Sequence, residues 1–254
     1  MKTSLQIVIP VLNEELSLFN SVNKLHQSIS STLIDYDWKI NIVDNGSTDK
    51  TPEISKDLTS RFKEVFYTRL ELRGRGRALR TAWFNPQFDI HCYMDVDLST
   101  DLSVLPDMLD SICNENSDLV IGSRLKKQSK VINRPWNREI ISRIYSLIMR
   151  MVFIQGFKPL YIRDYQCGFK AISSKLANEL LPLVKDNGWF FDSELIVLAI
   201  KNHYNVKEIP VRWVDDPDTR VKIIKTAIED LSGIARLKFG YVREVEKLLA
   251  QKNS

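Results

Sequence analysis

Short apolar runs alternate with amphipathic segments along the first half of the chain. Such runs are typical of parallel strands that are covered on both faces, whereas the segments between them repeat their apolar positions at helical spacing. The predicted strands are Leu5–Pro10, Trp38–Asp44, Val65–Thr68, Ile90–Met94 and Asp118–Ile121. The alternation predicts an α/β fold with a mostly parallel, Rossmann-like sheet that is flanked by helices.

The second half of the chain follows a less regular pattern. Its predicted elements are a strand-like piece around Gly168, a helix at Asp192–His203, a strand at Val206–Val214, and helices from Asp218 to Phe239 and from Val242 onward. No linker, low-complexity tract or internal repeat divides the sequence. We therefore expect one α/β domain over residues 1–217 and a C-terminal helical extension over residues 218–254.

Composition excludes several classes of protein. The chain has 254 residues, of which 44% are hydrophobic and 27% charged, so it is neither disordered nor fibrous. Its three cysteines are widely spaced, which favours a reducing cytoplasm over a disulfide framework or a zinc site. No stretch reaches the roughly 20 apolar residues that span a bilayer, so we expect no membrane crossing.

Positive charge is concentrated in one block. Residues 123–175 hold twelve Lys and Arg against two acids, although the net charge of the whole chain is only +4. Between Ile140 and Phe153 these cations accompany apolar residues at helical spacing, which predicts a basic amphipathic helix. That helix could lie at the interface with an anionic membrane, or could turn its apolar face to the core. Nucleic acid is not an expected partner, because the block has no recognisable binding motif.

Polar clusters follow the predicted strands at their carboxyl ends. They are Asn13-Glu14, Asp44-Asn45, the run Arg73–Arg77, and Asp95-Val-Asp97. In open parallel sheets, ligands bind beyond these strand ends. The pair Asp95 and Asp97 offers oxygen ligands of the kind that Mg²⁺ or Mn²⁺ accepts, although such a pair can also simply form a turn.

The glycine-rich run Leu72–Ala78 is a second candidate for anion binding. It resembles a phosphate-cradling loop at the start of a helix, where free N–H groups and cations favour an anion. A tight turn that carries solvated arginines is the alternative interpretation.

Taken together, the motifs resemble those of family 2 glycosyltransferases with the GT-A fold, and more narrowly those of dolichyl- or polyprenyl-phosphate sugar synthases. The resemblance covers roughly residues 4–215. Its motifs are VIPVLNEE (8–15), IVDNGSTDKT (42–51), GRGRA (74–78), MDVDLSTD (94–101), IGSR (121–124), DYQCGFKA (164–171), WFFDSEL (189–195) and KEIPVRW (207–213). Two residues depart from the family pattern: Asn45 replaces a second acid, and Ser99 stands where some relatives have a Gln.

The resemblance implies a role for each motif residue. The nucleotide sugar would be bound by Pro10, Asn13, Glu14, Asp44, Arg75 and Asp95, and the Mg²⁺ or Mn²⁺ ion by Asp95 and Asp97. The acceptor phosphate would be held by Arg124, Arg138, Ser142 and Arg220. Asp97, Arg124, Arg138 and Ser142 would carry catalysis. On a helix, Arg138 and Ser142 lie four residues apart and share one face.

The expected function is inverting transfer of a hexose, glucose or mannose, from a UDP- or GDP-sugar to polyprenyl or dolichyl phosphate. The protein would act as a peripheral protein at the cytoplasmic face of the membrane. A phosphate monoester is largely a dianion near neutral pH, so this reaction needs no general base. The alternatives are a family 2 enzyme with a sugar hydroxyl as acceptor, for which Asp164, Asp192 or Glu194 could act as base, and a non-catalytic nucleotide- or membrane-binding protein.

Overall fold

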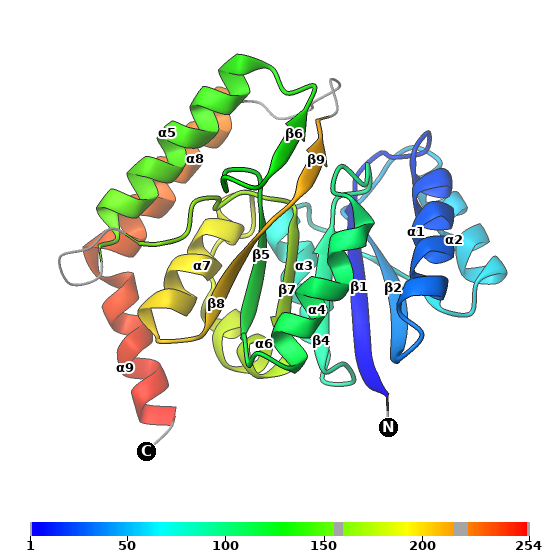
Figure 1. Ribbon diagram of the computed structural model, residues 1–254, viewed down its shortest axis with the longest axis horizontal. Helices are drawn as coiled ribbons and strands as arrows, with labels where there is room; N and C mark the ends of the chain where they lie inside the picture. The colour runs from blue at the N-terminus through cyan, green and yellow to red at the C-terminus, as the bar shows by residue number, and fades with distance from the viewer. Residues whose placement is uncertain (1, 155–159, 216–222, 253–254) are drawn as a thin grey trace.

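The computed structural model describes residues 2–154, 160–215 and 223–252. Within this part of the chain, seven strands form the main sheet in the order β3-β2-β1-β4-β7-β5-β8, and two more form a small second sheet (Figure 1). The strands are β1 Thr3–Val11, β2 Tyr36–Asp44, β3 Val65–Arg69, β4 Ile90–Met94, β5 Leu119–Ser123, β6 Lys130–Ile132, β7 Phe169–Ser173, β8 Val206–Pro210 and β9 Arg212–Val214. The helices are α1 Leu18–Thr32, α2 Thr51–Arg61, α3 Arg75–Trp83, α4 Leu105–Cys113, α5 Trp136–Val152, α6 Ser174–Leu180, α7 Phe191–Lys201, α8 Ile223–Arg236 and α9 Val242–Lys252.

The sheet is mostly parallel and is buried between helices, as the sequence predicts. β1 pairs in parallel with β2 and with β4, so that Val11 stands opposite Asp44 and Val8 opposite Tyr93. Alternate residues of each strand enter different hydrophobic clusters: Val8 packs toward α3 and α7, whereas its neighbour Ile7 packs toward α1 and α4. The carboxyl ends of β1, β2 and β4 therefore lie at the same edge of the sheet.

The strand-like piece around Gly168 is β7, and it runs antiparallel between β4 and β5. In this register Lys170 stands opposite Tyr93 on β4, and Phe169 stands opposite Met94. The sequence pattern predicts the strand but not its direction. The position of β7 between β4 and β5 brings the segment around Gly168 next to Asp95.

The predicted strand Val206–Val214 is two strands. β8 ends at Pro210, which has no N–H to donate to a neighbouring strand, and β9 leaves the main sheet to pair with β6. A bridge between Thr100 and Trp213 ties β9 to the loop after β4. Trp213 and Asp215 are thereby delivered to the same edge of the molecule as the ends of β1, β2 and β4.

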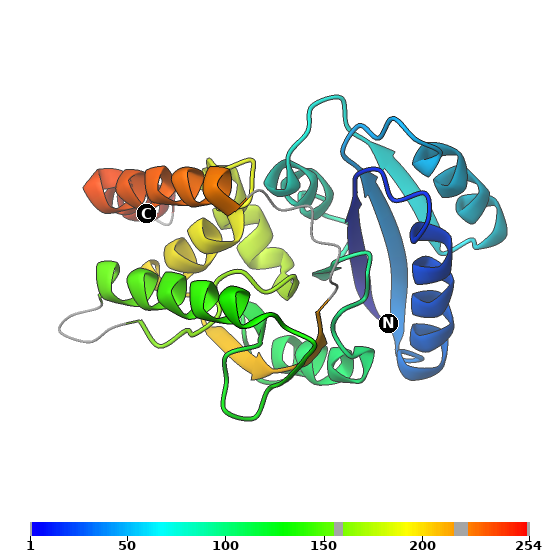
Figure 2. The ribbon, with the colours of Figure 1, turned by 90° about the horizontal axis from the view of Figure 1, so that it is seen from above.

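The C-terminal helices pack on the body of the protein. α8 and α9 meet at Leu237–Tyr241, where Gly240 has a positive φ of 142°. Leu237 and Val245 are fully buried in the cluster that also contains α7. Seen from above, α5 and α8 run along the two sides of α7 (Figure 2). The predicted helix from Asp218 begins in residues that lie outside the described part of the chain.

Helix α5 turns its apolar face outward, so the interpretation of a core-facing helix is wrong. Its buried residues are Ser142, Ser146 and Met149. The apolar residues on the opposite face are exposed by 38% to 77%: Trp136, Ile140, Ile141, Ile144, Leu147, Ile148 and Met151. Polar residues occupy the inner face of α5 near its start because this face covers a cluster of charged side chains.

Candidate active site

The loops after β1 and β2 form the first part of the site, and they are tied to each other. Asn13 has a positive φ of 55°, and its Oδ1 accepts a hydrogen bond of 2.8 Å from the backbone N of Thr48. Glu14 follows it, and its backbone N donates to Oγ1 of Thr51 at 2.8 Å. Pro10 lies one residue before the end of β1. Asn13 and Glu14, two of the residues that the resemblance assigns to the nucleotide sugar, are thus held against the loop after β2.

Asp44 ends β2 as a fully buried carboxylate. It accepts hydrogen bonds from the Tyr67 hydroxyl at 2.8 Å, from Nη1 of Arg69 at 3.0 Å and from the backbone N of Ser47 at 2.8 Å. Tyr67 and Arg69 belong to β3 and were not predicted as site residues. Because Asp44 is held from three sides, it fixes the shape of the loop in which a nucleoside would lie.

Asp95 and Asp97 follow β4 at the same edge. Asp97 is exposed, and its carboxylate accepts from the backbone N of Ser99 at 3.0 Å and from the Ser99 hydroxyl at 2.7 Å. Asp95 is partly exposed and accepts from Nη2 of Arg75 at 2.8 Å. Burial raises the pKa of Asp95, and the nearby charge of Asp97 acts in the same direction. A small hollow beside Asp95 is lined in part by Thr100 and Trp213.

These two acids fit a divalent cation that also binds a diphosphate. Each carboxylate oxygen can accept more than one bond, so the contacts of Asp97 with Ser99 leave capacity for a metal. Within the described residues no group of three or more His, Cys, Asp or Glu could enclose an ion. Mg²⁺ in particular is commonly held by one or two carboxylates together with phosphate oxygens and water. Asp95 and Asp97 are the residues that would hold it.

Arg75 connects Asp95 to a buried polar network. Its guanidinium lies over the rings of Tyr93 and Trp189, at 5.3 and 4.6 Å from their centroids. The Tyr93 hydroxyl donates to Asp192 at 2.9 Å, and the fully buried Lys170 pairs with Asp192 at 3.0 Å. Burial alone would lower the pKa of Arg75, but the charge of Asp95, together with Tyr93 and Asp192, raises this pKa overall. Arg75 therefore stays charged.

Tyr93, Lys170 and Trp189 were not predicted as site residues. Lys170 stands in the motif DYQCGFKA, which was the available signal, but its partner Asp192 is distant in sequence and lies on another element.

The glycine-rich loop before α3 does not present the free N–H groups that the sequence suggests. The backbone N of Gly76 donates to the carbonyl of Gly188, and that of Arg77 donates to the carbonyl of Asn187, both at 3.2 Å. The start of α3 is therefore closed by the segment before α7. Of this loop, Arg75 contributes to the site through its side chain.

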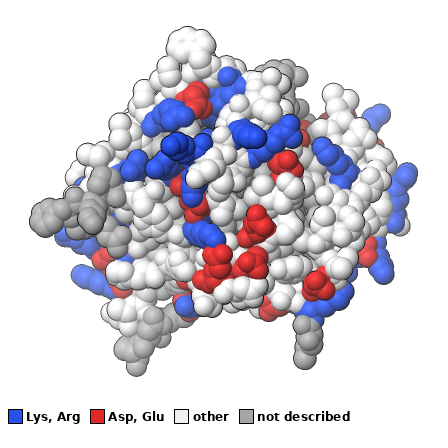
Figure 3. Space-filling view, in the orientation of Figure 1, with Lys and Arg blue, Asp and Glu red and all other residues white. Residues whose placement is uncertain are grey.

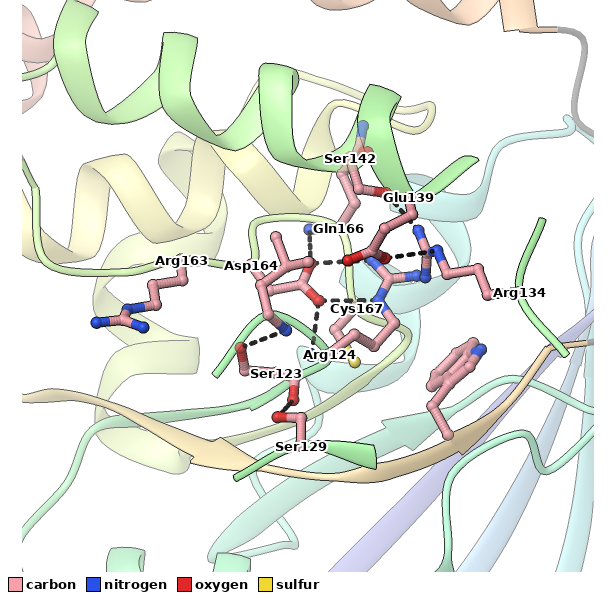
Figure 4. Close-up of polar contacts among 12 residues, drawn as sticks. Ser123, Arg124, Ser129, Arg134, Glu139, Ser142, Arg163, Asp164, Gln166 and Cys167 are labelled. Atoms are coloured by element: carbon pink, nitrogen blue, oxygen red, sulfur yellow. Dashed lines mark hydrogen bonds and ion pairs between the residues drawn. The ribbon is translucent and has the colours of Figure 1, made fainter. Parts of the chain in front are cut away.

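Arg124 directly follows β5 and pairs with the buried Asp164. Its Nε and Nη2 donate to the two oxygens of Asp164 at 2.8 and 2.9 Å, which is a bidentate pair (Figure 4). Burial alone would raise the pKa of Asp164, but Arg124 brings it down to about 2. The guanidinium of Arg124 also stacks over Trp213, at 5.1 Å from the ring centroid. Arg124 is thus a rigid and permanently charged group.

Arg138 and Ser142 lie on the inner face of α5, as their spacing predicts. Arg138 pairs with the buried Asp215 at 2.8 Å, and the Ser142 hydroxyl donates to the carbonyl of Arg138 at 2.9 Å. The Trp213 indole donates to Asp215 at 3.0 Å. Trp213 therefore contacts Arg124 and the acid that pairs with Arg138. It also lines the hollow beside Asp95 and so links the arginines to the acids after β4. Arg220 lies outside the described residues.

Arg134 is a further arginine of this cluster, and sequence reasoning did not select it. It precedes α5, its side chain is only 6% exposed, and it donates to the hydroxyl of Ser142 (Figure 4). Burial lowers the pKa of Arg134, and the positive charge of Arg124 lowers it further. No motif marks this residue, so only the fold reveals its position.

Comparison with known proteins agrees with the motif resemblance. The family model described as Glycosyl transferase family 2 matches residues 6–181. Glycosyltransferase AglD of Haloferax volcanii is 32% identical over 91% of this chain, which spans 36% of the length of AglD. A dolichyl-phosphate beta-glucosyltransferase of Saccharomyces cerevisiae is 26% identical over 94% of this chain and 75% of its own length.

A solved structure confirms the predicted GT-A fold. Glucosyl-3-phosphoglycerate synthase of Mycobacterium tuberculosis, in complex with Mn²⁺, UDP and glucosyl-3-phosphoglycerate, is similar with a TM-score of 0.61 and 19% identity. The match covers 96% of this chain and 80% of that chain. The structural similarity concerns the fold, whereas the family model covers more than half of the chain: the chain belongs to glycosyl transferase family 2.

Proposed function

We propose that this protein transfers a hexose from a nucleotide sugar to the phosphate of polyprenyl or dolichyl phosphate. The observation that carries the proposal is the cluster of arginines, Arg124, Arg134 and Arg138, which Trp213 connects to the acids after β4. Arginine is well suited to phosphate because its planar group can donate two parallel hydrogen bonds. The names of the dolichyl-phosphate relatives agree with such an acceptor.

On the donor side, the loops after β1 and β2 would enclose the nucleoside, and the diphosphate would lie beside Asp95 and Asp97. A Mg²⁺ or Mn²⁺ ion held there would neutralise the charge of the leaving nucleoside diphosphate. The similar solved structure is a complex with Mn²⁺ and UDP, which supports the use of a divalent ion. Arg75 keeps Asp95 oriented through their 2.8 Å contact.

The proposed chemistry is a single displacement. An oxygen of the lipid phosphate forms a bond to the anomeric carbon of the hexose, while the bond from that carbon to the nucleoside diphosphate breaks, so the configuration inverts. The arginines position the phosphate for attack, and positioning of this kind can supply much of the rate enhancement. No proton has to be removed, because the attacking group is already an anion.

The ionisable groups near the site favour phosphate over a sugar hydroxyl as acceptor. A hydroxyl acceptor would need a general base. Asp164 is paired with Arg124, and Asp192 is paired with Lys170. Glu194 is fully buried, and Arg236 donates to it at 2.6 Å. Each of the three acids considered for that role is therefore engaged in an ion pair.

The outer face of α5 would hold the protein on the membrane that contains the acceptor. This face carries the exposed apolar residues described above, together with the exposed Arg143. Basic side chains gather on the upper part of the molecule, where α5 lies (Figure 3). An apolar face bordered by cations binds anionic lipid surfaces. In the described part of the chain, no helix is long and apolar enough to cross a bilayer. We propose peripheral attachment at the cytoplasmic face.

A transfer assay tests this function. Purified protein is mixed with Mn²⁺ or Mg²⁺, a labelled UDP- or GDP-hexose, and either polyprenyl phosphate or polyprenol. Label should enter the organic phase only with the phosphate. Asp97→Asn should remove most activity, whereas Asp37→Asn is a matched control, because Asp37 is exposed at the opposite end of β2. Equal transfer to polyprenol, or transfer to neither lipid, would contradict the proposal.

A further inference from the structure

Arg134 has hydrogen-bond donors that the described part of the chain does not satisfy. Its Nη2 donates to the Ser142 hydroxyl, but Nη1 and Nε are buried and meet no hydrogen-bond acceptor among the described residues. Nε lies 3.3 Å from Oε2 of Glu139, which is an ion-pair distance without hydrogen-bond geometry. A buried cation with unused donors is costly unless a ligand completes its bonding.

The other arginines of the cluster each have a carboxylate of their own. Arg124 has Asp164 at 2.8 Å, and Arg138 has Asp215 at 2.8 Å. Among the residues that the structure describes, Arg134 pairs only with Glu139, and this acid is shared. Oε1 of Glu139 is held by Arg143, one turn further along α5, with a contact of 2.6 Å.

Glu139 can therefore keep a partner if Arg134 leaves it. The contact with Arg143 is shorter than that with Arg134 and satisfies a different oxygen. Arg134 is also close enough to Arg124 for the two positive charges to repel each other. A negative ligand between them would relieve that repulsion, and its oxygens would accept the unused donors of Arg134.

We propose that Arg134 binds the phosphate monoester of the acceptor through Nη1 and Nε, and that Glu139 occupies this place until the ligand arrives. Glu139 then remains with Arg143 alone, while the Ser142 hydroxyl keeps Arg134 in position. This inference rests on the proposed function, and it adds one binding residue and one competing acid to the acceptor site.

Equilibrium binding tests the inference without turnover. The probe is geranyl phosphate, with geraniol as the uncharged control, measured by calorimetry on the full chain. Hydrogen bonds to a charged group are worth about 1.5–3 kcal/mol, so Arg134→Gln should weaken binding about 10- to 100-fold. Arg134→Lys should lie between, because it keeps the charge but loses the planar group. Arg163→Gln is the matched control, since Arg163 is exposed and points away from the cluster (Figure 4).

Glu139→Gln separates ligand binding from a structural role. If Glu139 competes with the phosphate, its neutralisation should tighten binding, by up to about fivefold for a partly exposed ion pair. If Arg134 and Glu139 only hold the start of α5, both substitutions should weaken binding. The nucleotide-sugar affinity and the melting temperature are measured alongside, and both should stay close to those of the unmodified protein.

Unchanged affinity in Arg134→Gln, or weaker binding in Glu139→Gln, would overturn the inference. A failure of the proposed function would show differently, because the unmodified protein would then bind geranyl phosphate and geraniol alike and transfer sugar to neither lipid.

Discussion

Gly168→Ala is a small change that should disable the proposed donor site. A Cβ at this position would lie 1.8 Å from Oδ2 of Asp95, 2.5 Å from its Cγ and 3.0 Å from Nη2 of Arg75. Ordinary contacts begin near 3.4 Å, so the carboxylate has to move by more than 1 Å. Arg75 limits that movement, because it is itself held against Tyr93 and Trp189.

The cost falls on catalysis more than on folding. A misplacement of about 1 Å in a reacting group can lower the rate about 100-fold, which corresponds to about 2.7 kcal/mol of lost transition-state stabilisation. Asp95 is partly exposed at the edge of the sheet, so its displacement removes no core contact. We expect kcat/KM to fall about 100-fold and the affinity for Mn²⁺ to weaken, while the melting temperature changes little.

The assay is steady-state transfer at several Mn²⁺ concentrations, together with thermal unfolding. Gly188→Ala is the matched control. It lies in the segment that closes the start of α3, and the nearest atom to its added Cβ would be Oδ1 of Asp186 at 3.5 Å. Activity within threefold of the unmodified protein in Gly168→Ala, or an equal loss in both variants, would refute the role given to Asp95.

Three further results are expected. Burial raises the pKa of Asp230 to about 7, so the folded chain keeps a proton that the unfolded chain releases near pH 4, and stability falls as the pH rises between these values. Asp230→Asn should therefore be the more stable protein at pH 8, by at most about 4 kcal/mol, and show no advantage at pH 4 in chemical unfolding. Asp164 has a pKa of about 2, so its ion pair stabilises the folded state above pH 4, and this stabilisation is lost as the pH falls toward 2. Asp164→Asn should therefore lower the free energy of unfolding by about 2–3 kcal/mol at pH 7. It should also raise the KM for the lipid phosphate, because it releases Arg124. Replacing both Ile144 and Leu147 with Asp should reduce sedimentation with anionic vesicles at least about tenfold. The melting temperature should not fall, because both side chains are more than half exposed. Full retention of vesicle binding would contradict the role given to α5.

The fold, and the edge of the sheet where the acids of the proposed donor site meet, could be predicted because local patterns determine them. Apolar runs mark strands buried on two faces, and parallel strands place their carboxyl ends together, so Asp44, Asp95 and Asp97 had to lie at one edge. Arg138 and Ser142 share a face of α5 for an equally local reason, since they are one helical turn apart.

What the sequence left undecided depends on contacts between distant segments. Helical spacing shows that α5 has an apolar face but not which way it points, and the structure turns it outward. The direction of β7 and its place between β4 and β5 are long-range choices as well. Arg134 belongs to no motif, and its importance follows only from its burial beside Arg124 and Ser142.

Mass spectrometry of the reaction products tests the central claim most directly. Unmodified protein is incubated with a nucleoside diphosphate hexose, polyprenyl phosphate and Mn²⁺, and both the lipid and the nucleotide are identified. The account predicts a lipid that gains one hexose and still contains a single phosphorus, with an equal amount of nucleoside diphosphate. A lipid diphosphate with release of nucleoside monophosphate, or hexose attached to a hydroxyl while the lipid phosphate stays unmodified, would contradict it.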